Sequence, residues 1–188
     1  MKPNKFVIPG RLRYTTGDAT IPESAGHRLI IHVCNDIGAW GAGFVLAVSK
    51  RWKKPEAEYK SWFRSKTNLK LGEIQNVDVQ SDTAVVNMVA QRGLGKDEDG
   101  QIPLRYDALE SCLDKVGELA LKTGSSVHAP RFGAGLAGGE WNRIEPMIVD
   151  KLIRRGINVT IYDLPAEKIE KQTKFYSLLE DEVKVKEK

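Results

Sequence analysis

Two stretches of this chain share one order: an apolar segment, a run of glycines, and then the start of a helical pattern. The first glycine loop, Gly38–Gly43, follows the β-rich run Arg28–Cys34, and the second glycine loop, Gly133–Gly139, follows the apolar run Ser125–Ala129. Glycine permits positive φ and close backbone approach, and a helix start presents free N–H groups with partial positive charge. In a parallel sheet both loops open at the carboxyl edge, where α/β folds bind ligands. The pair predicts a diphosphate site between the loops, against the alternative of two unrelated tight turns.

The remaining segments alternate between strand-like and helix-like patterns, which predicts a three-layer α/β/α domain with a central mixed, largely parallel sheet. A length of 188 residues suits one domain, which we expect to cover residues 1–164. The polar, glycine-bearing stretch 91–101 predicts a mobile loop. Strands are expected at 11–15, 28–34, 73–79, 83–90, 125–129 and 157–162, and helices at 44–51, from 55, at 103–122 and at 141–155.

Composition narrows the class of protein. The two cysteines, Cys34 and Cys112, are too few for a disulfide framework or a four-cysteine zinc site. No apolar run approaches the ~20 residues of a membrane span, and Met1–Phe6 lacks the apolar core of a secretory signal. We therefore expect a cytoplasmic protein with no metal, no cofactor and no membrane partner. Residues 165–188 are rich in Lys and Glu and are expected to form a charged tail, either a short helix or partly disordered.

The net charge of +4 arises near the N-terminus, because residues 1–70 hold 13 basic and 5 acidic side chains. The densest basic cluster, Lys50–Lys54, includes Trp52 and has two interpretations. One is attraction of a polyanion, either nucleic acid or a phosphate-bearing ligand. The other is a solvated helix end, where cations suit the carbonyl pole of the helix dipole. Nucleic acid is therefore a minor candidate partner.

The second glycine loop also fits the dinucleotide-binding pattern GxGxxG, because Gly133, Gly135 and Gly138 have that spacing. Asp163, at the end of the next expected strand, stands near where an acidic residue would bind ribose. An oxidoreductase domain of this type needs further β–α–β units after that acidic residue. Only 25 residues follow Asp163, so the oxidoreductase interpretation is disfavoured.

Several motifs together resemble the macrodomain family, the ADP-ribose-binding module. The similarity is greatest to the branch of terminal ADP-ribose protein glycohydrolases and their bacterial relatives. It extends over residues 11–164 and leaves the tail outside. It implies that the ligand is ADP-ribose, free or attached to a protein. The matching stretches are Gly17–Thr20, His32–Asp36, Gly38–Phe44, Pro130–Leu136, Trp141 and Val159–Leu164.

The resemblance also implies which residues contact the ligand. Asp18 would accept a hydrogen bond from the adenine amino group, although Asp also commonly shapes a turn. Asn35 would hydrogen-bond the distal ribose, and Tyr162 would stack on adenine or pack in the core. The full set of implied ligand contacts is Asp18, Ala19, Asn35, Trp40, Gly41, Gly43, Phe44, Arg131, Gly133, Ala134, Gly135, Leu136, Ala137, Gly138 and Tyr162.

The chain departs from the family at two catalytic positions. Animal glycohydrolases of this branch use a lysine that attacks the anomeric carbon and an aspartate in the second loop. Ala137 stands where the aspartate is expected, and Ala90 or Gln91 stands where the lysine is expected. Neither Ala nor Gln can form the covalent adduct. The resemblance then implies a water-based, lysine-independent hydrolysis that removes mono-ADP-ribose from acidic side chains.

Three residues near the end of the run Arg28–Cys34 are the candidates for orienting that water: His32, Asn35 and Asp36. A histidine in a buried strand also has a simpler explanation as a core residue with satisfied hydrogen bonds. Two other functions use the same binding residues. One is an ADP-ribose reader without turnover, and the other is a phosphatase acting on ADP-ribose-1''-phosphate.

Overall fold

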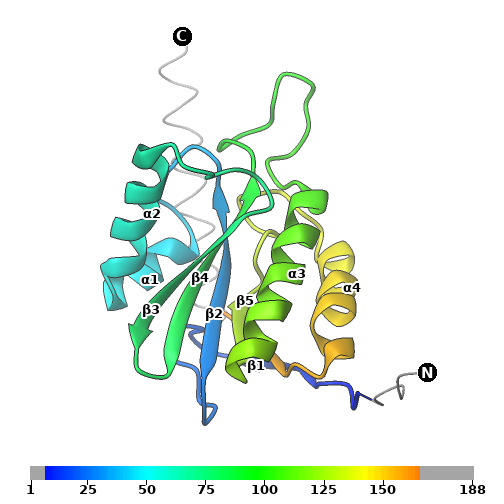
Figure 1. Ribbon diagram of the computed structural model, residues 1–188. Helices are drawn as coiled ribbons and strands as arrows, with labels where there is room; N and C mark the ends of the chain where they lie inside the picture. Colours follow the sequence, from blue (N-terminus) through cyan, green and yellow to red (C-terminus); the bar gives the residue numbers. More distant parts are fainter. Residues whose placement is uncertain (1–6, 166–188) are drawn as a thin grey trace, which may run out of the picture.

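The computed structural model describes residues 7–165, which fold around one six-stranded sheet of order β1-β6-β5-β2-β4-β3 (Figure 1). The expectation of a charged tail over 165–188 falls almost wholly outside the described residues. The strands are β1 (Leu12–Thr16), β2 (Arg28–Asn35), β3 (Ile74–Gln80), β4 (Thr83–Gln91), β5 (Ser126–Pro130) and β6 (Val159–Asp163), and the helices are α1 (Phe44–Arg51), α2 (Lys54–Ser65), α3 (Tyr106–Thr123) and α4 (Trp141–Lys151), with a 3₁₀ turn at Ile153–Arg155.

β2 lies inside the sheet because its run of branched apolar residues can be buried on both faces. Its neighbours β4 and β5 are parallel to it, and β6 and β1 continue the parallel pairing beyond β5. β3 is antiparallel to β4. The expected mixed, largely parallel sheet is confirmed. Because five strands are parallel, their carboxyl ends meet along one side of the sheet, which we call the carboxyl edge.

Helices cover the two faces of the sheet, as expected for a three-layer α/β/α fold (Figure 1). α3 and α4 pack on one face around a larger core, in which Leu109 and Ile144 are fully buried. α1 and α2 pack on the other face around a smaller core that includes Tyr59. Side chains alternate along the strands and supply both cores, so Ile31 belongs to the larger core and Ile30 to the smaller one.

The face that carries α1 and α2 is polar over β1, β6 and β5. His128 and Tyr162 lie on this half, and the connection 17–27 between β1 and β2 passes over them. Ser24 of that connection lies within hydrogen-bond distance of His128, at 2.9 Å. Among the described residues, the connection 17–27 is the segment that covers this half of the face.

Most element boundaries lie within one or two residues of the expected ones, with two differences. α3 begins at Tyr106 rather than at Pro103, because Leu104 instead pairs with Gln91 at the end of β4. The helix expected over 141–155 is divided, since Leu152 leaves the helical backbone conformation and a 3₁₀ turn follows it.

Candidate functional site

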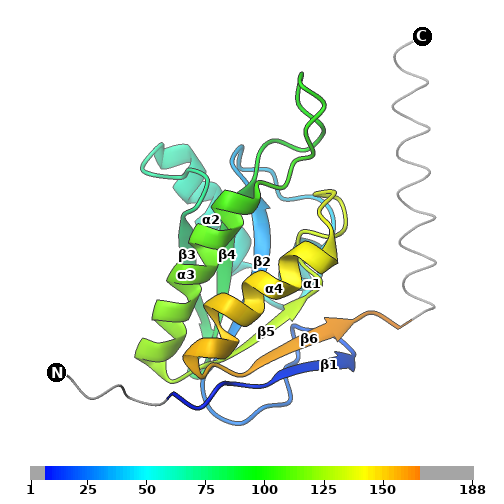
Figure 2. The same cartoon turned by 90° about the vertical axis from the view of Figure 1, so that its right-hand side faces the viewer.

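Three loops meet at the carboxyl edge (Figure 2). The first glycine loop follows β2, the second follows β5, and residues 92–105 join β4 to α3. We call residues 92–105 the arm, because they extend well beyond the ends of the strands (Figure 2). At its base, the N–H of Gly93 donates to Asp36 Oδ1 at 2.9 Å, and the N–H of Leu104 donates to the carbonyl of Ala137 at 3.0 Å. The base of the arm therefore contacts both Asp36, two residues before the first glycine loop, and Ala137 of the second glycine loop.

The glycines of the two loops differ in whether the fold requires a residue without a side chain. Gly38 has φ +73°, and a Cβ there would overlap the ring of Phe63 in α2, so the fold itself requires glycine. Gly41 and Gly135 have no positive φ, and a Cβ at either position would meet nothing within 4 Å. The fold makes no demand for glycine at these two positions. Their missing side chains leave open space beside the loop backbone, where a ligand can approach closely.

The helix that follows each glycine loop begins without a capping side chain. α1 begins at Phe44 and α4 at Trp141, and neither has a side-chain cap or an acidic residue in its first turn. α2 and α3 also lack a side-chain cap, but they follow no glycine loop and carry Glu56 and Asp107 in their first turns. Free N–H groups and the helix dipole make an uncapped helix start attractive to anions. The start of α1 can therefore bind phosphate oxygens, whereas Glu140 at the N-cap of α4 weakens the attraction there.

Asn35 ends β2, and its side chain is turned into the protein. Its Oδ1 accepts hydrogen bonds from the N–H groups of Ile37 at 3.2 Å and Ala39 at 2.9 Å, and its Nδ2 donates to the carbonyl of Ala39 at 2.7 Å. Tyr59 of α2 donates to the backbone carbonyl of Asn35. Both polar atoms of the Asn35 amide are thus engaged in shaping the turn 36–39. The ribose contact implied for Asn35 stays a prediction.

His32 lies in the smaller core and is 1% exposed. Its Nε2 is 2.7 Å from Oδ1 of Asn87, whose Nδ2 donates to Gln75 at 3.0 Å. An amide oxygen only accepts, so Nε2 of His32 carries the proton. The ring lies edge-on to Trp40 with centroids 5.5 Å apart. Burial lowers the pKa of His32 to about 4, which keeps the ring neutral near neutral pH.

Asp36 differs from Asn35 and His32, because it keeps a free oxygen. Oδ1 accepts the hydrogen bond from Gly93, and the Asp36 N–H donates to the carbonyl of Gln91 at 2.9 Å. Within residues 7–165, Oδ2 has no hydrogen-bond or ion-pair partner. Of the three candidate catalytic residues, Asp36 therefore has a carboxylate oxygen available to a ligand or a water.

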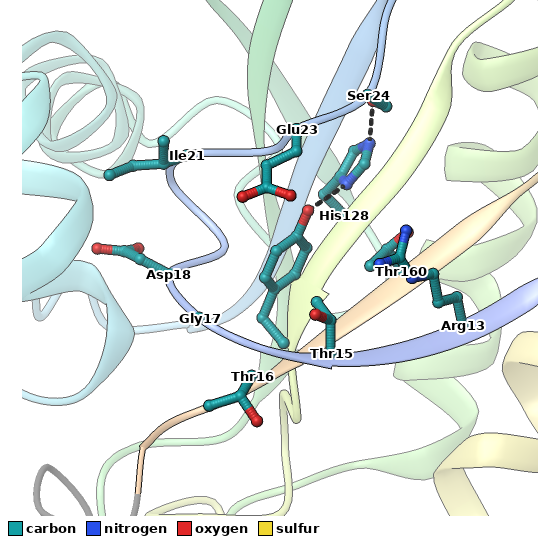
Figure 3. A pocket seen from close by; sticks show the side chains of 11 residues that line it. Arg13, Thr15, Thr16, Gly17, Asp18, Ile21, Glu23, Ser24, His128 and Thr160 are labelled. Carbon is teal, nitrogen blue, oxygen red and sulfur yellow. Dashed lines mark hydrogen bonds between the residues drawn. The ribbon is translucent and has the colours of Figure 1, made fainter.

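A cavity of about 350 Å³ lies over the sheet face at β1, β6 and β5, under the connection 17–27, and extends to the carboxyl end of β1 at Gly17 and Asp18. Asp18 and Tyr162, the two residues implied to contact adenine, both line it. The Asp18 carboxylate points away from His128 (Figure 3). One of its oxygens accepts hydrogen bonds from the N–H and hydroxyl of Thr20, at 2.9 and 2.8 Å. Asp18 thus shapes its own turn and keeps its second carboxylate oxygen outside that turn.

The deeper wall of this cavity is a hydrogen-bonded polar network (Figure 3). Nε2 of His128 lies 2.9 Å from the hydroxyls of both Ser24 and Ser126, and Nδ1 lies 3.1 Å from the hydroxyl of Tyr162. Burial, together with the positive charge of Arg28, lowers the pKa of His128 to about 4. The network is therefore neutral and holds the connection 17–27 against the sheet.

Arg131, at the start of the second glycine loop, is bound to the end of β6. Its Nε and Nη2 lie 2.5 and 3.0 Å from the two carboxylate oxygens of Asp163. Its guanidinium also lies over the rings of Tyr14, at 4.9 Å, and Trp141, at 5.2 Å. The ion pair raises the pKa of Arg131 and lowers the pKa of the Asp163 carboxyl. Arg131 thus connects the start of the second loop to β6 through Asp163, and to β1 and α4 through the rings of Tyr14 and Trp141.

The other implied ligand contacts lie in the same loops or beside them. No motif in the sequence marks Gly93 and Leu104 of the arm or Tyr59 of α2, although all three contact the segments around these loops. Ala19, Trp40 and Ala137 are buried, Gly43, Phe44, Gly133 and Ala134 are half-buried, and Gly41, Gly135, Leu136 and Gly138 are exposed.

The basic cluster Lys50–Lys54 spans the junction of α1 and α2. Lys54 donates to the carbonyl of Asp78 at 2.9 Å, and Arg51 lies 5.0 Å over the ring of Trp52.

In the described part of the chain, no helix is long and apolar enough to cross a membrane. Among the same residues, no three His, Cys, Asp or Glu side chains are grouped to hold a metal ion.

Two solved structures are each 47% identical in sequence to this chain. A protein of unknown function from Bacteroides thetaiotaomicron has a TM-score of 0.81, with 82% of this chain and 99% of that chain covered. A macrodomain protein from Streptomyces coelicolor has a TM-score of 0.72, with 81% and 99% covered. DarTG of Thermosipho africanus, solved in complex with ADP-ribose, is 22% identical with a TM-score of 0.59 over 74% of this chain and 38% of that one. At that identity it supports the fold alone.

No family model matches the sequence. Among curated proteins, the chromodomain-helicase-DNA-binding protein 1-like of Danio rerio is 30% identical over 161 residues, which are 80% of this chain. The chain spans 15% of the length of that relative. An ADP-ribose 1''-phosphate phosphatase of Lodderomyces elongisporus is 21% identical over 160 residues, which are 81% of this chain and 99% of that protein.

Proposed function

Because this chain belongs to the macrodomain family, we propose that it binds ADP-ribose along the carboxyl edge and hydrolyses ADP-ribosyl linkages there. One observation carries the binding proposal. Each glycine loop leads into a helix with no side-chain cap and no acidic first turn, and the base of the arm contacts both Asp36 and Ala137. Free N–H groups at two helix starts on one edge suit a diphosphate, and the start of α1 is the more attractive of the two because α4 has Glu140 at its N-cap.

The remaining parts of the ligand follow from that diphosphate position. The adenine lies toward Asp18 and Tyr162, where one carboxylate oxygen of Asp18 is left over from its own turn. The distal ribose lies toward Asp36, near the base of the arm. Gly41 and Gly135 flank the diphosphate with backbone that no side chain covers.

The hydrolysis we propose uses water and no covalent adduct, because Ala90, Gln91 and Ala137 cannot supply the nucleophile or the acid of the lysine mechanism. The water oxygen forms a bond to the anomeric carbon as the bond from that carbon to the acyl oxygen breaks. The leaving group departs with the electron pair as a carboxylate, so it needs no proton. The free oxygen of Asp36 orients the water and accepts its proton. His32 and Asn35 contribute indirectly: His32 packs against Trp40, and Asn35 hydrogen-bonds the turn 36–39.

Binding is tested by calorimetry with ADP-ribose against ADP, using two matched glycine variants. Gly135→Val places a side chain over the expected diphosphate, and we expect affinity to fall by at least about tenfold. Gly95→Val is the control, because Gly95 also has open space around it and no positive φ but lies in the arm. Equal affinities for the two variants, or no preference of the wild type for ADP-ribose over ADP, would contradict the proposed site.

Turnover is tested separately, with protein carrying mono-ADP-ribose on glutamate. The wild type should release ADP-ribose, and Asp36→Asn should slow release by about 10²-fold or more, the usual contribution of a general base. A protein that stays fully labelled with excess wild type would exclude the hydrolase. Incubation with ADP-ribose-1''-phosphate, followed by a phosphate assay, tests the phosphatase alternative in the same way.

A reader without turnover is the second candidate, and one observation favours it. The amide oxygen of Asn35 and one of its two N–H groups are used in the turn 36–39, so Asn35 has no acceptor left for a proton of the water, and His32 is buried and neutral. Chemistry would thus depend on Asp36 alone among the three candidates. Binding of ADP-ribose without any release from labelled protein would establish the reader and remove the hydrolase.

A further inference from the structure

We propose that Tyr59 is a positioning residue and that one stripe of α2, formed by Glu56, Tyr59 and Phe63, holds the first glycine loop in the shape that binds ligand. This inference rests on the proposed ADP-ribose site. The three residues stand at positions i, i+3 and i+7 of a helix, so they share one face. Tyr59 and Phe63 contact the segment 35–40 directly, and Glu56 is connected to it through Ser49.

The first direct contact is made by the hydroxyl of Tyr59. The ring is fully buried in the smaller core, 5.4 Å from the ring of Trp40. The hydroxyl donates to the backbone carbonyl of Asn35 and lies 3.2 Å from Asn35 Oδ1. Burial raises the pKa of the Tyr59 hydroxyl, so the group keeps its proton and stays a donor. Asn35 in turn binds both the N–H and the carbonyl of Ala39.

The second direct contact is made by the ring of Phe63. Gly38 lies against this ring so closely that even one added carbon would overlap it. Gly38 also has φ +73°, which other residues adopt only with strain. The turn 36–39 is therefore pressed on α2 on one side and bound to the Asn35 amide on the other.

The indirect connection is a relay that ends on Glu56. The indole N–H of Trp40 donates to Ser49 at 2.7 Å, and the Ser49 hydroxyl donates to Glu56 at 2.7 Å. The ammonium group of Lys60 donates to the other carboxylate oxygen of Glu56 at 2.7 Å. The hydrogen bond and ion pair with Lys60, and then the Ser49 hydroxyl, lower the pKa of the Glu56 carboxyl, so it remains an acceptor. Trp40 is thereby fixed directly before Gly41, the glycine with open space around it.

α2 therefore acts on the ligand site without touching it. The stripe sets where the first loop leaves β2, how it turns at Gly38 and where it enters the stretch before α1. Because these contacts with α2 fix the conformation of the first glycine loop, its N–H groups are held in one arrangement. Loosening the stripe should weaken binding even where the glycines and the core packing are intact.

Tyr59→Phe is the sharpest test, because it removes one oxygen and keeps the buried ring. Trp62→Phe is the matched control. It removes the indole N–H that donates to the Thr67 carbonyl at 2.7 Å, on the same helix but away from the loop. Affinity for ADP-ribose is measured by calorimetry well below the unfolding temperature. Amide hydrogen exchange at Ile37 and Ala39 is measured without ligand.

For Tyr59→Phe we expect affinity to fall by about tenfold and exchange at Ile37 and Ala39 to accelerate by about the same factor. Trp62→Phe should stay within about twofold of the wild type in both. Glu56→Gln, a second variant that weakens the Ser49 relay, should also lower affinity. Unchanged affinity and exchange in Tyr59→Phe, or equal losses in Trp62→Phe, would overturn the proposal. If the wild type fails to bind ADP-ribose, the proposed function fails, whereas the exchange measurement still decides whether Tyr59 positions the loop.

Discussion

Acidification should destabilise this domain through a histidine that has no partner charge. His32 is almost fully buried, and its hydrogen bonds go to the neutral side chain of Asn87 and toward the thiol of Cys34. Burial lowers its pKa from 6.5 to about 4. The unfolded chain therefore takes up a proton below pH 6.5 that the folded chain refuses until the pH approaches 4. Stability is full above that window and falls as the pH drops through it.

The size of the effect follows from the two pKa values. Between about pH 7.5 and about pH 5, the unfolded state gains about 2 kcal/mol from protonation of His32, and the full difference at lower pH is about 3.4 kcal/mol. His128, whose pKa is also lowered to about 4, acts in the same direction. Against a typical domain stability of about 5–15 kcal/mol, the two losses together are large.

Urea unfolding at the two pH values measures this loss, with His32→Gln as the comparison. Glutamine can still donate to Asn87 but does not take up a proton. The variant should be less stable near neutral pH, because it fills the site poorly, and its loss of stability on acidification should be smaller by about 2 kcal/mol. Identical losses in wild type and variant would refute the reasoning that the buried ring resists protonation.

Three further substitutions have expected outcomes. Ser49→Ala leaves the buried indole N–H of Trp40 without its acceptor and should cost about 1–3 kcal/mol in urea unfolding; an unchanged midpoint would mean that water replaces the hydroxyl. Arg131→Leu breaks a half-exposed ion pair with Asp163 and should cost at most about 1 kcal/mol, with the loss shrinking in high salt, whereas a salt-independent loss would point to ring packing instead. Leu109→Ala opens a cavity in the larger core and should cost about 2–5 kcal/mol by thermal unfolding; a smaller loss would show that the core collapses around the gap.

Local patterns predicted much of the fold, because they reflect burial. The run Arg28–Cys34 indicated a strand covered on both faces, and β2 lies inside the sheet with neighbours on both sides. Residues 91–101, which include most of the arm, were predicted as a mobile loop because they are polar and contain glycine. The closing of the base of the arm depends on backbone hydrogen bonds between Arg92 and Pro103 and between Ala90 and Arg105, which no side-chain pattern encodes.

The sequence indicates the outline of the proposed site, but it does not indicate the contacts that support its loops. The glycines marked both loops, since glycine is needed where backbone must turn or stay uncovered. Asn35 was identified, but the direction of its amide depends on the Tyr59 hydroxyl, 24 residues away in the sequence. Tyr59 is a buried aromatic residue of an amphipathic helix, and burial alone does not distinguish a side chain that fills space from one that also holds a loop.

The contacts that order these loops have a thermodynamic consequence for binding. The turn 36–39, Trp40 and the base of the arm are ordered by contacts inside the protein, so their conformational entropy is lost when the chain folds and not when a ligand arrives. A ligand entering such a preorganised site gives up mainly its own freedom. Association should then resemble docking to a rigid surface, with rates that change little with temperature and with little ordering of the protein on binding.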